Sequence, residues 1–153
     1  MENDILFDPA RMGGVMERVF GEKADDISVI RSLIASESAG INRYSAISSR
    51  LGGDAGKTVR QIMQTKRGNL KLLQALYYIK TGKAAENAPS CAVLSGTAEE
   101  LRLLYRAELN ISRDYASAAG ISESPELRDE LMSMSRASSA DAYSLLLLMK
   151  RFV

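Results

Sequence analysis

The stretch Ala107–Ala118, AELNISRDYASA, decides the fold, because it places a carboxylate in the middle of an apolar helix face. The residues of that face recur at a spacing of three or four, which keeps one side of an α-helix turned inward. They are Leu101, Leu104, Glu108, Ile111, Tyr115 and Ala118. We therefore predict a helix that directs Glu108 into the protein core.

An earlier part of the chain repeats this pattern. Its inward positions are Ile27, Ile30, Ile34, Glu37, Ile41, Tyr44, Ile47 and Leu51. In both copies a tyrosine follows the glutamate two helical turns later on the same face: Tyr44 after Glu37, and Tyr115 after Glu108. The repetition predicts that the rest of the chain is arranged around two inward glutamates.

Composition limits the class of protein. With 153 residues, 46% of them hydrophobic, the chain is long enough for one domain with a sizeable core. The net charge is only +1 and basic residues do not cluster, which argues against nucleic acid as a partner. The chain contains no histidine.

Nothing in the sequence indicates export or membrane insertion. The first residues lack a basic segment followed by an apolar one, so we expect no signal peptide. No apolar run reaches the ~18 residues that a membrane span needs. The single cysteine, Cys91, excludes an intrachain disulfide, which fits a reducing compartment. We therefore expect a cytoplasmic protein without membrane contact.

Residues 1–24 are predicted to be an appendage to the main domain, 25–153. Asp8 and Pro9 could start a short helix that ends near Gly21. Its apolar positions are Met12, Val15, Met16, Val19 and Phe20. Such a segment can lie against its own domain or against a partner chain.

The main domain is predicted to be an all-α four-helix bundle. Periodicity and glycines indicate helices over about 25–51, 54–81, 95–120 or 97–120, and 127–152, with Asp54 as a candidate cap of the second. The first and last links are short and imply antiparallel hairpins. The middle link, 82–95, can extend to roughly 46 Å, longer than the ~38 Å of a typical helix here. It can therefore cross the whole bundle between the second and third helices.

Polar residues interrupt the apolar face of every helix at about its middle. Besides the two glutamates, they are Lys66, Asn69, Ser138 and Asp141. The fourth helix could instead align three residues earlier, with Ser135 and Ser138 inward. Polar groups at this depth are unfavourable unless they satisfy one another, so we predict that they form one connected layer.

This arrangement resembles the rubrerythrin-like branch of the ferritin-like superfamily, over about residues 25–152. The resemblance implies one Glu on helices 1 and 3, here Glu37 and Glu108, and an E-x-x-H pair on helices 2 and 4, all directed at a dinuclear metal site. Both E-x-x-H motifs are missing. Lys66-Arg67-Gly68-Asn69 and Ser138-Ser139-Ala140-Asp141 stand in their places.

The substitutions argue against the metal chemistry that the resemblance implies. A dinuclear site needs several carboxylates and imidazoles, and an ammonium at Lys66 would stand where a cation should bind. We predict that Lys66 replaces the metal charge by pairing with Glu37 and Glu108. Tyr44 and Tyr115 are interpreted as core aromatics that bond the carboxylates, in preference to redox tyrosines.

Three functions remain open. The first is a metal-free binding or assembly module without a cofactor, which pairs as a homodimer through the apolar run Leu145–Met149. The second is an oxidoreductase or metal-storage protein that holds iron or manganese by Glu37, Glu108 and Asp141. The third is a small-molecule pocket in the polar layer, for a ligand that no residue specifies.

Overall fold

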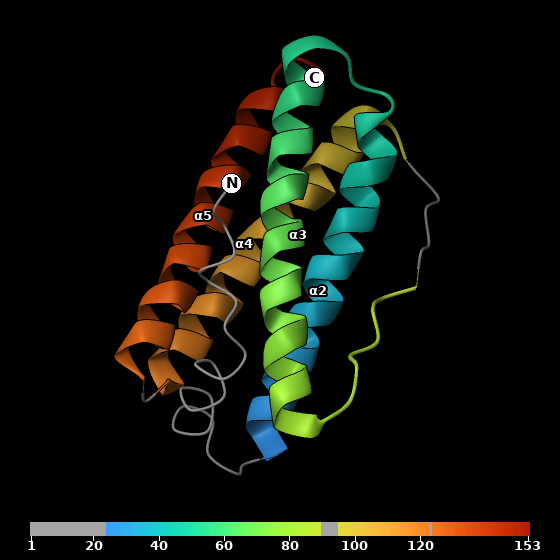
Figure 1. The fold of residues 1–153 in the computed structure, drawn as a ribbon. Coiled ribbons are helices and arrows are strands. Elements are labelled where there is room, and N and C mark those ends of the chain that lie inside the picture. The colour runs from blue at the N-terminus through green and yellow to red at the C-terminus, as the bar shows by residue number, and fades with distance from the viewer. Residues whose placement is uncertain (1–23, 90–94, 123) are drawn as a thin grey trace, which may run out of the picture.

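The computed structural model describes residues 24–89, 95–122 and 124–153 (Figure 1). These residues form four long helices and no strand, which confirms the predicted all-α four-helix bundle. The helices are α2 (Ala24–Ser48), α3 (Gly53–Thr81), α4 (Thr97–Ile121) and α5 (Pro125–Met149). Residues 1–23, which make up almost all of the predicted appendage, and Cys91 lie outside the described residues.

Local chemistry sets the end of α3 and the start of α5. α3 ends at Thr81 because Gly82 adopts a left-handed conformation, with φ of 67°, and its N–H donates to the carbonyl of Tyr78 at 2.8 Å. α5 begins at Pro125, after Ser124 accepts a hydrogen bond from the N–H of Leu127.

Three predicted details at helix ends are wrong. α2 stops at Ser48, before the predicted Leu51, because the chain turns where the N–H of Arg50 donates to Ile47 O. Asp54 does not cap α3; it lies in the first turn, where its charge suits the helix dipole. α5 ends at Met149, so Phe152 lies beyond the helix and is exposed.

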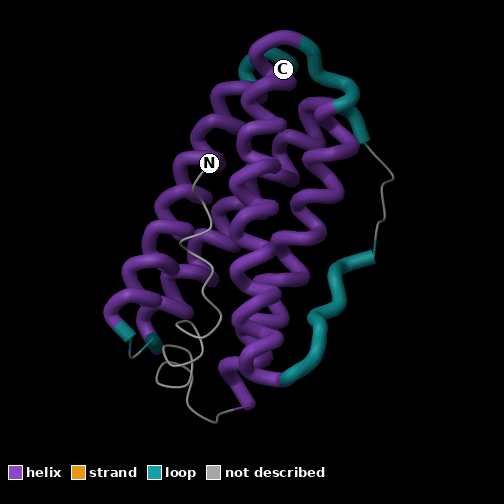
Figure 2. The backbone as a smooth tube through the Cα atoms, in the orientation of Figure 1, coloured by secondary structure: helices purple, strands orange, loops and turns teal. Residues whose placement is uncertain are grey.

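The directions of the four helices depend on the long connection between α3 and α4. α2 and α3 form an antiparallel hairpin, and so do α4 and α5 (Figure 1). α3 ends at the lower end of the bundle in this view, whereas α4 begins at the upper end and runs parallel to α3. Figure 2 shows the described part of the connection rising along the outside of the bundle. The chain therefore traverses the bundle between α3 and α4.

A polar layer divides the apolar core into two clusters. On α2, Ile34 belongs to one cluster and Tyr44 to the other, and Glu37 lies between them. Lys66 on α3 and Glu108 on α4 likewise separate residues of the two clusters and are themselves buried. Of the six polar positions predicted from the sequence, four are buried and two, Asn69 and Asp141, are partly buried.

Serine hydroxyls join α4 to α5. Ser112 donates to the carbonyl of Ser135 and Ser135 donates to the carbonyl of Ser112, both at 2.8 Å. Ser139 adds a hydroxyl contact to Ser112 at 2.7 Å. These small side chains let the two helices approach closely. Ser135 is therefore used at the α4–α5 contact, and the buried Ser138 takes the core position.

Among the described residues, no helix combines the length and the apolar character that crossing a lipid bilayer requires.

Candidate functional site

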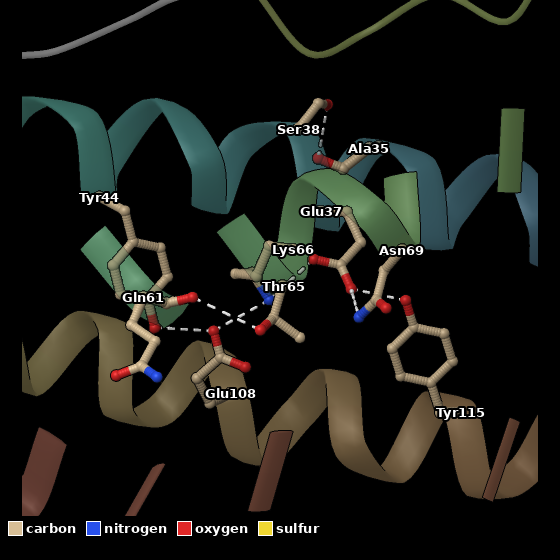
Figure 3. A network of polar contacts seen from close by, with 10 residues as sticks. All are labelled: Ala35, Glu37, Ser38, Tyr44, Gln61, Thr65, Lys66, Asn69, Glu108 and Tyr115. Carbon is tan, nitrogen blue, oxygen red and sulfur yellow. Dashed lines mark hydrogen bonds and ion pairs between the residues drawn. The ribbon is translucent and has the colours of Figure 1, made fainter. Parts of the chain in front are cut away.

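Lys66 is the centre of the polar layer. Its side chain extends from α3 between α2 and α4 and is almost completely buried (Figure 3). Nζ lies 2.8 Å from Oε2 of Glu37 and 2.9 Å from Oε1 of Glu108. One ammonium therefore bridges the two buried glutamates, which is the pairing that the sequence predicted.

Each glutamate is also bonded by the tyrosine of the opposite helix. Tyr44 on α2 donates to Oε1 of Glu108 on α4 at 2.8 Å. Tyr115 on α4 donates to Oε1 of Glu37 on α2 at 2.5 Å (Figure 3). Because α2 and α4 run in opposite directions, a tyrosine two turns beyond one glutamate reaches the level of the other. Each copy of the sequence pattern thus supplies the tyrosine that bonds the glutamate of the other copy.

Asn69 acts as a donor in this layer. Its Nδ2 lies 3.3 Å from Oε1 of Glu37, so the amide supports the carboxylate and does not offer its carbonyl as a metal ligand. Two buried carboxylate oxygens, Oε2 of Glu37 and Oε2 of Glu108, accept no hydrogen bond from the described residues. The first forms the ion pair with Lys66, whereas the second remains open. The layer is therefore almost, but not fully, satisfied.

The charges in the layer support one another. Burial lowers the pKa of Lys66, but the attraction of Glu37 and then of Glu108 outweighs that effect, so the pKa is raised and the ammonium stays charged. Burial, followed by the charge of the bonded glutamate, raises the pKa of Tyr44 and of Tyr115. Both phenols therefore remain protonated donors at neutral pH.

The α5 residues of the predicted layer behave differently from each other. Burial, and then the charge of Glu108, raise the pKa of Asp141 to about 7, against the attraction of Lys66. The charges of the ion network therefore change the pKa of Asp141, which is itself only partly buried. Ser138 is buried, but within the described part of the chain it forms no ion pair or hydrogen bond with Glu37, Lys66 or Glu108.

Gly40 is a residue of this site that the sequence analysis missed. It lies one turn after Glu37 on α2, and a Cβ placed there would meet Cε of Lys66 at 2.9 Å. The missing side chain makes room for the lysine to pass α2. A glycine in the middle of a helix, close to an inward glutamate, was the available sign, since glycine is unfavourable at such positions.

We expect Gly40→Ala to destabilise the protein by about 1 kcal/mol, because crowding against the held Lys66 side chain exceeds the gain in helix propensity. The matched control is Gly68→Ala on α3, where an added Cβ meets nothing within 4 Å. That variant should gain about 1 kcal/mol. Urea denaturation measures both, and a stabilising Gly40→Ala would contradict the packing described here.

A buried Glu100 holds the start of α4 and was also missed. One oxygen accepts from Nη1 of Arg43 at 2.9 Å, and the other accepts from the N–H of Ser95 at 2.9 Å. Arg43 thus ties α2 to the beginning of α4, outside the polar layer.

The residues present do not suit the dinuclear metal site that the resemblance implies. Both oxygens of Glu37 and one of Glu108 already contact Lys66, a tyrosine or Asn69. Within the described ranges, no three His, Cys, Asp or Glu side chains converge as metal ligands. A cation could enter only if the ammonium left. The chemistry of the donors thus favours an internal ion network over a metal.

Comparisons with known proteins support the fold alone. No protein-family model matches the chain, and no curated protein matches it. Among solved structures, it is similar to a conserved hypothetical protein, rv2844, from Mycobacterium tuberculosis, with a TM-score of 0.72 and 18% sequence identity. The similarity covers 85% of this chain and 94% of that one.

Proposed function

We propose that this chain is a metal-free bundle that acts as a binding or assembly module, and that Lys66 supplies the positive charge that a metal would otherwise supply. One observation carries the proposal: a buried ammonium lies within 2.9 Å of both inward glutamates. An ammonium is held there by hydrogen-bonding carboxylates, without the open coordination positions that metal catalysis requires.

The proposal includes a relation to ferritin-like proteins of the rubrerythrin branch. The traversing connection between α3 and α4 supports it, as do the two inward glutamates on α2 and α4. Lys66 and Asn69 on α3, with Ser138 and Asp141 on α5, then occupy the positions of the two lost metal-binding pairs.

Assembly through α5 forms part of the same proposal. Tyr143 and Leu147 follow each other on the outer face of this helix and are 62% and 43% exposed. Large apolar side chains at helical spacing on a surface suit contact with another helix. A second copy of the chain offers the same face, which suits a symmetric homodimer.

Metal analysis tests the proposal. We expect protein produced with iron, manganese and zinc to contain far less than one metal ion per chain, at the level of a Glu37→Ala/Glu108→Ala variant. Lys66→Ala should take up more metal than the wild type, because it frees both carboxylates. Near-stoichiometric metal in the wild type that disappears in the double variant would overturn the proposal in favour of an oxidoreductase or metal store.

A further inference from the structure

An apolar groove lies on the outside of α3, beside its last turns. It has a volume of about 630 Å³. Its apolar lining comes from α3 and from the chain just beyond it: Ala75, Tyr78, Ile79, Ala84 and Ala85. Tyr78 exposes 61% of its surface, which is unusual for a large aromatic residue beside other apolar groups.

The groove has a defined wall. After α3 the chain turns back along the hairpin, where Gln74 Nε2 donates to Oδ1 of Asn87 at 2.8 Å. The N–H of Ala88 donates to Oγ of Ser38 at 2.8 Å, which ties the same segment to α2. These bonds hold Ala84 and Ala85 opposite α3, so the groove exists before anything binds.

The N-terminal 23 residues join the bundle next to this groove. α2 begins at Ala24, at the end of the hairpin where α3 finishes (Figure 1). Ile27 near the start of α2 packs against the same core cluster as Ile79 and Ala85 of the groove. The segment that precedes Ala24 is thus attached at the same end of the bundle as the groove.

The sequence of this tethered segment matches the groove in its apolar pattern. Its apolar residues share one helix face: Met12, Val15, Met16, Val19 and Phe20. If that face runs along α3 from the level of Tyr78, Asp8 comes roughly 18 Å farther on. The exposed Arg67 of α3 lies at about this distance from Tyr78, roughly 16 Å. The carboxylate of Asp8 and the guanidinium of Arg67, which have opposite charges, would then lie at the same level.

We propose that residues 1–23 dock in cis into the groove of their own chain, with the Met12–Phe20 stripe against Ala75, Tyr78 and Ile79. The short tether supports docking within the chain, since it gives the segment a high effective concentration at its own groove. Docking covers Tyr78 and the wall formed by Ala84 and Ala85.

Hydrogen exchange of the full chain tests this proposal. In Val15→Asp/Val19→Asp, amides of residues 71–85 should exchange on the order of tenfold faster than in the wild type, while those of α4 and α5 stay unchanged. The matched control, Glu17→Ser/Arg18→Ser, changes the face of the predicted helix that lies opposite the apolar stripe. It should leave the exchange of residues 71–85 unaltered. Unaltered exchange in the Asp variant would overturn the proposal.

A groove-side variant and the molecular mass complete the test. Ala75→Glu leaves the segment intact and should speed exchange within residues 12–20; no change there would contradict docking. Sedimentation distinguishes a domain swap from docking in cis. A mass equal in the wild type and in Val15→Asp/Val19→Asp supports docking in cis, and a mass that falls in the variant would show docking into a partner chain instead.

Discussion

The Lys66→Ala variant is expected to lose about 3–5 kcal/mol of unfolding free energy. The substitution leaves Glu37 and Glu108 facing each other in the core without a positive charge, and both are almost completely buried. An uncompensated buried charge is among the few single changes with so large an effect. Urea denaturation at pH 7 measures the loss.

Two controls separate this effect from ordinary loss of a side chain. Lys57→Ala removes an exposed lysine of the same helix and should change stability by less than about 0.5 kcal/mol. Glu37→Gln/Lys66→Met/Glu108→Gln removes all three charges and should be more stable than Lys66→Ala alone. A loss near that of Lys57→Ala, or a triple variant less stable than the single one, would refute a charge-based role for Lys66.

Asp141 should make the protein less stable as the pH rises towards neutrality. Its pKa increases from an ordinary 3.8 to about 7 in the folded state. Between these values the folded protein keeps a proton that the unfolded chain releases, so the free energy of unfolding falls as pH rises through this window. The full shift would correspond to about 4 kcal/mol. Partial exposure and screening reduce our expectation to roughly 2 kcal/mol.

The Asp141→Asn variant isolates this effect. Its amide cannot ionise, so the variant should be more stable than the wild type at pH 8 and should lack the decline between pH 5 and 7. The chain has no histidine, which leaves few other groups to titrate there. Asp129→Asn, at an exposed position of α5, is the control. Equal pH slopes in Asp141→Asn and the wild type would show that Asp141 is ionised throughout.

The amino-acid sequence by itself determined the helices and the residues that they turn inward. Helix periodicity and end chemistry are local properties, so Gly82 marks the end of a helix without reference to the rest of the chain. The placement of Glu37, Lys66 and Glu108 at mid-stripe likewise follows from spacing along each helix. Their pairing could be predicted because a buried ammonium and buried carboxylates need each other.

Only the tertiary structure decided how the members of the polar layer are connected. The bond from each tyrosine to the glutamate of the opposite helix depends on α2 and α4 running antiparallel at a particular level. The same is true of the space that Gly40 leaves for Lys66. Tertiary structure also decides that Ser138 is buried outside the ion network, whereas the charges of Glu108 and Lys66 change the pKa of Asp141. These features arise from the mutual placement of helices, because a repeat along one helix specifies a face but not its partner across the core.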